Sequence, residues 1–210
     1  MTGRPDAGRG RERRPPASSE PDAPGEARPL RLFVAVDVPD DVRDALDAAV
    51  APLRASMPGA RWTPPENWHV TLKFLGSVRP AMLNDVALAV RDAAGQQTAF
   101  RARVEGMGAF PSANRARVVW AGLEDRHGEL AALARSVDRA LEFGFPMEER
   151  PFAGHLTLAR LKMQARLPGE LSALDVTSRP FRVGAVRLYR SHLQRPAARY
   201  EVLQQLPLRD

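Results

Sequence analysis

Two copies of one short motif carry the residues best suited to chemistry in this 210-residue chain. Residues 69–72 and residues 155–158 both read His-apolar-Thr-Leu. In an extended strand, His and Thr two positions apart share one face, about 6.6 Å apart along the chain, and the apolar residues point the other way. Each copy therefore predicts a strand that presents one imidazole and one hydroxyl on its polar face.

Two imidazoles acting together suit an in-line displacement at phosphorus. One activates water and the other protonates the leaving oxygen, and histidine serves either role because its unperturbed pKa is about 6.5. The hydroxyls of Thr71 and Thr157 can donate to phosphoryl oxygens, which gain charge in the transition state. We expect His69, His155 and the two threonines to form one pseudo-symmetric phosphate site.

Other interpretations of the two motifs fit the residue types less well. Half-exposed strands tolerate His and Thr, so a single copy could be structural, whereas two matching copies favour a shared site. A zinc site takes at least three protein ligands, and the chain has no cysteine and no carboxylate within either motif. An RNA-binding module without turnover leaves the duplication unexplained. The motifs therefore favour a metal-free enzyme site.

Composition limits the class of protein and its partners. The 44% hydrophobic content fits a single domain with a substantial core. No apolar run approaches the roughly 18 residues of a membrane span and no signal peptide is visible, so we expect a cytoplasmic protein that does not enter a membrane. The net charge is +6 and 29 of the 31 basic residues are arginine. The guanidinium group of arginine binds phosphate oxygens well, and a basic surface attracts polyanions. Genome base composition can also raise the number of arginines.

Residues 1–28 differ in composition from the rest of the chain. They are rich in Pro, Gly, Ser, Arg and Glu, have no aromatic residue, and cannot bury enough apolar area to fold. Their six arginines face five acidic residues, which argues against a dedicated nucleic-acid arm. We predict a disordered, dispensable tail over residues 1–28 and one folded domain over residues 29–210.

Hydrophobic periodicity predicts an α+β fold for this domain. Strands and helices mix without the regular alternation of a doubly wound sheet, which favours mainly antiparallel sheets. The expected helices are residues 41–53, 81–94 and 129–143, with a weaker amphipathic stretch at 170–174. The expected strands are residues 32–36, 68–75, 100–107, 117–122, 151–161, 181–189 and 199–206.

The segments around the motifs resemble the two-histidine phosphoesterase superfamily. Within it, the sequence is similar to the RNA 2′,3′-cyclic phosphodiesterases of bacteria and archaea, the LigT-like or 2′-5′ RNA ligase family. One departure is Gly154, where the family usually places Pro before the second histidine, and we expect a softer strand start with the site retained. The resemblance covers residues 31–208. Its strongest stretches are residues 32–37, 65–76, 108–111, 118–122, 150–152, 188–193 and 200–202.

The resemblance implies a bilobal fold of two pseudo-symmetric halves. Each half would have a mainly antiparallel sheet flanked by helices, with the active-site cleft between them. The implied reaction is hydrolysis of RNA 2′,3′-cyclic phosphate termini to 2′-phosphate ends, with no metal and no organic cofactor. His69 would be the proton donor to the leaving oxygen and His155 the proton acceptor that activates water.

The motifs fix the reaction at phosphorus but leave the rest of the substrate open. Another small cyclic phosphate, a 2′-5′-linked oligonucleotide or ATP-independent 2′-5′ ligation are the alternatives. The expected partner is an RNA or oligonucleotide with a 2′,3′-cyclic phosphate end. We expect a monomer with no obligate protein partner.

Further candidates for the site lie near the motifs. Phe74 and Arg160 stand five residues after the two histidines, on the opposite strand face unless a bulge intervenes. The resemblance favours Arg160 as a phosphate contact and leaves Phe74 as either a core residue or a base-stacking platform. Lys73 shares the parity of His69, so it either faces the cleft near the phosphate or is a solvated lysine. Trp68 either stacks on a base or packs in the core.

Overall fold

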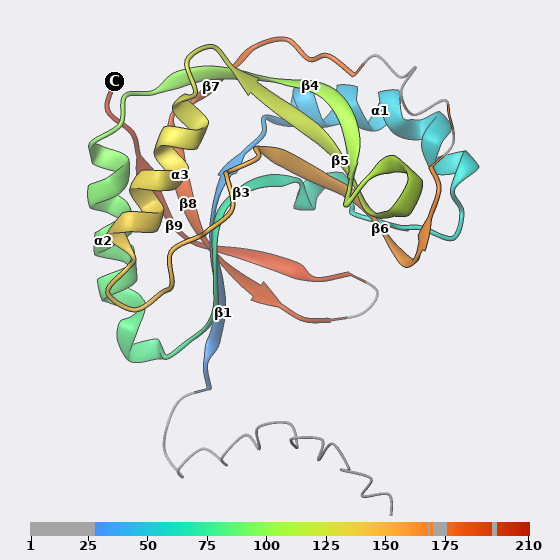
Figure 1. Ribbon diagram of the computed structural model, residues 1–210. Helices are drawn as coiled ribbons and strands as arrows, with labels where there is room; N and C mark the ends of the chain where they lie inside the picture. The colour runs from blue at the N-terminus through green and yellow to red at the C-terminus, as the bar shows by residue number, and fades with distance from the viewer. Residues whose placement is uncertain (1–27, 168, 170–175, 195–196) are drawn as a thin grey trace, which may run out of the picture.

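A single curled sheet forms the centre of the molecule (Figure 1). The computed structural model describes residues 28–167, 169, 176–194 and 197–210. Within them the sheet has nine strands in the order β7-β4-β5-β6-β3-β1-β8-β9, with β2 beside β6. Every pairing between these strands is antiparallel, so the predicted α+β class and antiparallel sheet are confirmed. The strands are β1 Leu30–Asp37, β2 Arg61–Trp62, β3 His69–Val78, β4 Phe100–Phe110, β5 Ala116–Asp125, β6 His155–Ala165, β7 Phe181–Val183, β8 Ala185–His192 and β9 Arg199–Pro207.

Apart from β2, the sheet consists of two four-stranded halves that meet between β3 and β6. Counted outward from that boundary, one half is β3-β1-β8-β9 and the other is β6-β5-β4-β7. Among the described residues, Val70 and Leu156 are the sole β-pair across the boundary, and both are fully buried. They are the second residues of the two motifs. The expected pseudo-symmetric halves are thus present, and their sheets join at the motifs themselves.

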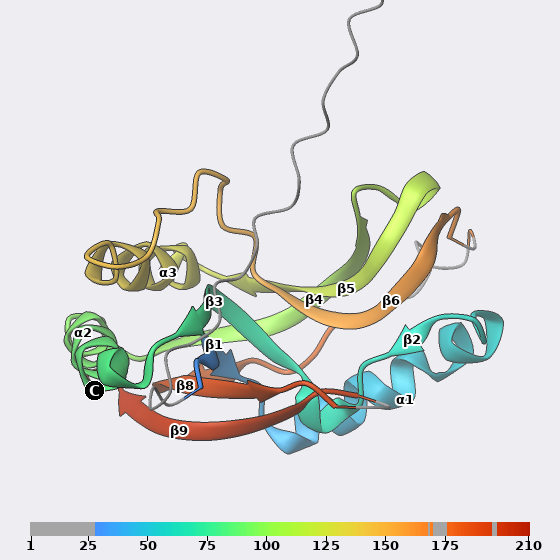
Figure 2. The same cartoon turned by 90° about the horizontal axis from the view of Figure 1, so that it is seen from below.

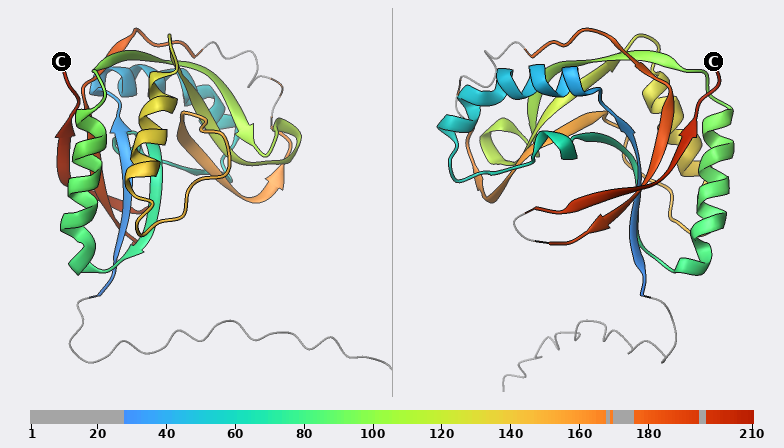
Figure 3. Two further views of the ribbon diagram at one scale, coloured as in Figure 1. Left: turned by 60° about the vertical axis from the view of Figure 1, so that its left-hand side comes forward. Right: turned by 180° about the vertical axis from the view of Figure 1, so that it is seen from behind.

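The helices lie at opposite ends of the sheet, α1 at one end and the adjacent α2 and α3 at the other (Figures 2 and 3). α1 follows β1, yet its residue Leu53 and the adjoining Met57 pack on Val119 and Ala159 of the other half. α3 follows β5, yet it lies on β3 of the first half. Each of these two helices therefore ties the halves together. The helices are α1 Asp40–Ser56, α2 Leu83–Gly95 and α3 Glu129–Ala140, with short 3₁₀ helices at Pro65–Asn67, Pro80–Met82 and Ala113–Arg115.

One main apolar core lies behind the strands that carry the motifs. Val34 of β1, Val70 of β3 and Leu156 of β6 are fully buried in it, together with the apolar sides of α2 and α3. Strand side chains alternate between faces. The polar residues of the motifs therefore lie on the opposite face of the sheet.

Some element boundaries differ from those predicted. The expected strand 181–189 is divided at Gly184 into β7, which pairs with β4, and β8, which pairs with β1. The two-residue β2 was not predicted, because so short a segment has no periodicity. The stretch at 170–174 and residues 1–27 of the predicted tail lie outside the described residues. No helix in the described part of the chain is long and apolar enough to cross a membrane.

Candidate active site

The two motifs lie side by side on the face of the sheet opposite the core. β3 begins at His69 and β6 at His155, and the bridge between the strands joins the second residue of each motif. His69 and Thr71 of one strand therefore lie beside Thr157 and His155 of the other, and all four are half-buried. We call this side of β3 and β6 the histidine face.

Both imidazoles are held by the same kind of hydrogen bond. Nδ1 of His69 lies 2.8 Å from the carbonyl oxygen of Asn67, and Nδ1 of His155 lies 2.7 Å from that of Ala153. A carbonyl oxygen only accepts hydrogen bonds, so Nδ1 carries the proton in each neutral ring. Nε2 is then the atom that accepts a proton in the neutral ring and donates one in the charged ring.

The threonine hydroxyls are free to bind a ligand. Across the described ranges, neither Thr71 nor Thr157 uses its hydroxyl in a hydrogen bond to the protein. In the same ranges, no three His, Cys, Asp or Glu side chains gather closely enough to hold a metal ion. The histidine face thus offers two imidazole Nε2 atoms and two hydroxyl donors.

A β-bulge reverses the alternation of β3 immediately after its motif. Leu72 is unpaired between Thr71 and Lys73, which pair with consecutive residues of β1. The bulge shifts the parity of the strand by one residue. Phe74 therefore lies on the histidine face, where it is 64% exposed, whereas Lys73 turns to the other face and is buried.

The same bulge occurs at the same place in β6. Leu158 is unpaired between Thr157 and Ala159, which pair with consecutive residues of β5. Arg160 consequently lies on the histidine face and is exposed. Strict alternation from His155 would have put it on the opposite face, so the bulge decides where this guanidinium lies.

The prediction that Lys73 lies near the phosphate or in solvent is wrong. Its ammonium group is buried, forms an ion pair with Asp138 of α3, and donates to the carbonyl oxygen of Pro146 at 2.7 Å. The other carboxylate oxygen of Asp138 accepts from the backbone N–H of Glu148 at 3.0 Å. Because these bonds reach two points of the segment that follows α3, they fix that segment against β3.

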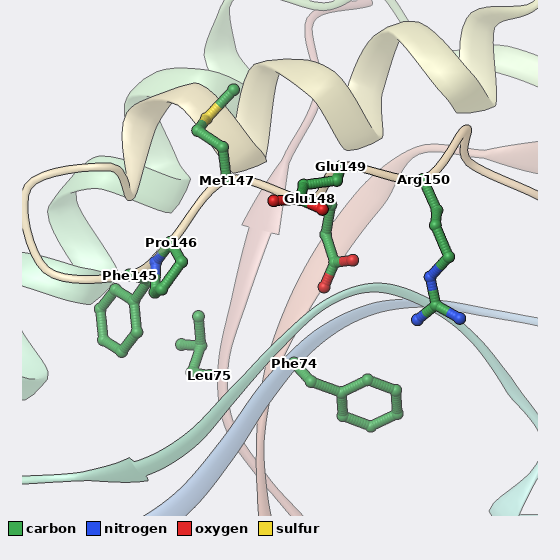
Figure 4. Close-up of a pocket in the computed structure, with 8 residues that line it drawn as sticks. All are labelled: Phe74, Leu75, Phe145, Pro146, Met147, Glu148, Glu149 and Arg150. Atoms are coloured by element: carbon green, nitrogen blue, oxygen red, sulfur yellow. The ribbon is translucent and has the colours of Figure 1, made fainter.

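The fixed segment forms one wall of a pocket beside the histidine face (Figure 4). The pocket has a volume of about 410 Å³ and is lined by Phe74, the next residue of β3 and residues 145–150. Arg150 extends from the segment toward the strand that carries Phe74. Phe74 is too exposed to be a core residue. Trp68 is only 1% exposed and its indole N–H bonds a backbone carbonyl at 3.0 Å, so it belongs to the core.

Aromatic rings surround the first histidine. The ring of Phe33 lies 4.7 Å from that of His69, Tyr200 meets it edge-on at 5.1 Å, and Tyr189 lies at 5.9 Å. Phe33 and Tyr189 are buried, and they stack on each other at 5.0 Å. The hydroxyl of Tyr189 donates to the carboxylate of Asp37. His69 thus stands against a packed aromatic wall.

Burial lowers the pKa of His69 from 6.5 to about 4, because the imidazolium form loses its hydration there. The carbonyl of Asn67 and the carboxylate of Asp37 act in the opposite direction, and the charges of Arg43 and His155 add to the lowering. In the free protein at neutral pH, His69 is therefore neutral and its Nε2 carries a lone pair.

His155 has a different environment. Phe110 meets its ring edge-on at 5.1 Å and Trp120 lies at 6.4 Å. Gly154 precedes it, and a Cβ at that position would come within 2.7 Å of a methyl group of Leu130.

A comparison with known proteins identifies the family. Residues 36–120 and 123–200 match the model of a family described as LigT-like phosphoesterases. The chain belongs to this family. The resemblance inferred from the motifs is thereby confirmed, and the protein is an enzyme of the phosphoesterase class.

Relatives of this LigT-like phosphoesterase are similar over most of its length. The RNA 2′,3′-cyclic phosphodiesterase of Methanothermobacter thermautotrophicus is 35% identical over 171 residues, which cover 78% of this chain and 91% of that protein. That of Geobacillus stearothermophilus is 31% identical over 180 residues, which cover 84% of this chain but only 56% of that protein. The crystal structure of E. coli LigT in complex with 3′-AMP is 27% identical, with a TM-score of 0.69 over 86% of this chain and 98% of that one.

Sequence reasoning assigned no role to the rings around the histidines. Tyr189, Tyr200 and Phe110 come from strands distant in sequence from the motif that each one contacts. All three lie in segments that resemble the family, and this resemblance was the one sequence feature that could have indicated a role for them. Their contacts with the imidazoles depend on strand register, which the motifs do not specify.

Proposed function

We propose that this LigT-like phosphoesterase hydrolyses RNA 2′,3′-cyclic phosphate termini to 2′-phosphate ends by metal-independent acid–base catalysis. The observation that carries the proposal is the paired arrangement of His69 and His155, each with Nδ1 bonded to a carbonyl and Nε2 left for chemistry. The names of the curated relatives support RNA 2′,3′-cyclic phosphate as the substrate. The complex of E. coli LigT with 3′-AMP supports a nucleotide ligand.

In the proposed reaction the two imidazoles act on opposite sides of the phosphorus atom. Nε2 of His155 accepts a proton from water as the water oxygen attacks phosphorus. The bond from phosphorus to the ribose 3′-oxygen breaks, and Nε2–H of His69 protonates that oxygen. Thr71 and Thr157 donate to the non-bridging oxygens, where negative charge increases in the transition state.

The low pKa of His69 makes its role as proton donor depend on the substrate. In the free protein the ring is neutral, whereas a proton donor must be charged. A cyclic phosphate diester carries one negative charge, and an opposite charge within about 4–6 Å favours the charged form of an imidazole. Substrate binding therefore raises the pKa of His69, and the proton is taken up as the complex forms.

The other candidate residues would contact either the terminal base or the phosphate of the substrate. Phe74 presents an exposed ring beside the pocket of about 410 Å³, which suits stacking on the terminal base. Arg160 lies beyond Thr157 on the histidine face and supplies positive charge to the strand. Lys73 is removed from this set, because its ammonium group is buried against Asp138.

The alternatives use the same site. Another small cyclic phosphate or a 2′-5′-linked oligonucleotide would meet the same imidazoles, and ATP-independent ligation is the reverse reaction. An RNA-binding module without turnover does not account for two imidazoles with matching tautomers. We also propose a cytoplasmic monomer, which cell fractionation and size-exclusion chromatography would test.

Product analysis with a short RNA ending in a 2′,3′-cyclic phosphate tests the proposal. We expect the product to be the 2′-phosphate, separated from the 3′-phosphate by chromatography, at a rate that EDTA does not change. A 3′-phosphate product would contradict the assigned leaving oxygen. Loss of activity in EDTA, restored by one added metal, would contradict the metal-independent mechanism.

A further inference from the structure

Two arginines face each other across β2 and β6, beyond the histidines. Arg61 pairs directly with Arg160, and the next pair is Trp62 with Ala159. The second pair packs in an apolar cluster beneath α1. Because neighbouring residues of a strand point to opposite faces, Arg61 and Arg160 both lie on the histidine face.

This arrangement is unfavourable without a negatively charged partner. Directly opposed residues of antiparallel strands have Cβ atoms about 5 Å apart, and like charges at such positions destabilise the sheet. Both arginines are exposed, and so is Lys162, two residues after Arg160 on the same strand face. Within the described part of the chain, none of these three side chains takes part in an ion pair or a side-chain hydrogen bond. An anion bound between them would relieve the repulsion.

The position of the pair separates it from the reacting phosphate. Arg160 is three residues beyond Thr157, which lies level with His69, and one of these residues is taken up by the bulge at Leu158. Two residue rises correspond to about 7 Å along β6. The reacting phosphate lies between His155 and His69, so an anion bound at the level of Arg61 and Arg160 would be the next group along the substrate. In an RNA strand, the neighbouring anion is the phosphate of the adjoining internucleotide linkage.

We propose that Arg61, Arg160 and Lys162 form a subsite for the internucleotide phosphate next to the cyclic phosphate end. This inference rests on the proposed function and deepens it, because it makes an RNA strand the preferred substrate over a cyclic mononucleotide. The planar guanidinium group offers two parallel N–H donors to phosphate oxygens. Arg160 is on the strand that carries Thr157 and is within reach of either phosphate. Arg61 serves the internucleotide phosphate alone.

The test compares three substrates with one variant and one matched control. The substrates are a 2′,3′-cyclic mononucleotide, a dinucleotide with the same cyclic end, and that dinucleotide with an uncharged methylphosphonate linkage. The unmodified protein should have a higher kcat/KM for the charged dinucleotide than for the mononucleotide. Arg61→Gln should lower the ratio of these two kcat/KM values on the order of tenfold, mainly by raising KM for the dinucleotide. The preference should disappear with the methylphosphonate substrate. Arg117→Gln removes one exposed charge from β5 and should keep the preference of the unmodified protein.

Other outcomes would contradict the subsite or the proposed function. An equal loss on the mononucleotide and the dinucleotide would assign Arg61 to the reacting phosphate and overturn the subsite. An equal loss from Arg61→Gln and Arg117→Gln would reduce the effect to net charge and also overturn it. Failure of the unmodified protein to hydrolyse even the cyclic mononucleotide and the dinucleotide would instead refute the proposed function.

Discussion

The halves that carry His69 and His155 share a local structure and differ in what surrounds it. Each half has the same motif, a bulge at the motif leucine, Leu72 or Leu158, and an imidazole whose Nδ1 bonds the carbonyl two residues earlier. The rings packed around His69 lower its pKa to about 4, whereas the half with His155 carries the exposed Arg160. Duplication of a motif thus fixes the local geometry, and the neighbouring strands give each copy its own chemistry.

The difference suits the two ends of a nucleotide. The aromatic side offers a base the exposed ring of Phe74, which lies beside the buried ring of Phe33. The other side presents Arg61 and Arg160 to anions. A substrate with a base at one end and a chain of phosphates at the other would therefore bind in one direction.

The largest expected effect comes from removing either imidazole. His69→Ala and His155→Ala should each lower kcat on the order of 10³-fold, and the double variant should be scarcely worse because the two residues act in one step. A substrate with a much better leaving group should rescue His69→Ala but not His155→Ala. Rescue of His155→Ala alone would reverse the assigned roles. Equal rescue of both variants would show that the two histidines do not have these separate roles, although both would still belong to the site.

A position that differs between the halves predicts a loss of stability. Four residues after each histidine, the first half buries Lys73 with Asp138, whereas the second half buries Ala159. Lys73→Met should lower the free energy of unfolding by about 3 kcal/mol, because it leaves a buried carboxylate without its partner. Urea unfolding measures this change, with the exposed Lys162→Met as the control. Equal small changes in the two variants would show that the buried ion pair contributes nothing net.

The threonines test how symmetric the phosphate site is. Thr71→Val and Thr157→Val keep a β-branched side chain of similar size and remove one donor, so each should lower kcat on the order of 10²-fold. Single-turnover measurements would separate this effect from binding. An unchanged rate for one variant would remove that threonine from the site and make the site one-sided.

The pH dependence of the rate distinguishes His69 in the free protein from His69 in the complex. The profile should be bell-shaped, with limbs that report the pair. The pH profile of kcat/KM reports the free protein, in which burial lowers the pKa of His69 to about 4. One limb of that profile should therefore lie near pH 4. The same limb should lie at higher pH in kcat, because a bound phosphate raises that pKa. Identical limbs in the two profiles would contradict substrate-linked protonation.

Another expected effect is on stability against acid. The folded pKa of His69 is about 4 and its unperturbed value is 6.5, so the unfolded chain binds more protons between these pH values. This contribution is fully present above about pH 6.5 and is lost as the pH falls toward 4. His69→Gln cannot titrate and should lose less stability than the unmodified protein between pH 7.5 and pH 4.5. Equal losses by urea unfolding would show that His69 titrates normally in the fold.

Much of the fold and of the candidate site could be predicted because it depends on local pattern. The repeat of His and Thr two positions apart placed His69, Thr71, His155 and Thr157 on strands, and all four lie on one face. Periodicity also indicated the three helices and most strands, since a buried face must repeat with the period of its element. The single expected strand over 181–189 was wrong, because the division at Gly184 depends on pairing with two different partner strands.

By itself, the sequence determined the duplicated motif, the family and the two pairs of catalytic candidates, because these are properties of residue type and spacing. Tertiary structure alone decided the rest. A strand's parity predicts a face only while its pairing is regular, so the bulge at Leu72 put Phe74 on the histidine face and buried Lys73. The pairing of Arg61 with Arg160 and the burial that lowers the pKa of His69 likewise join residues distant in sequence. Such neighbours are fixed by strand register and packing across the whole sheet, and no local pattern contains that information.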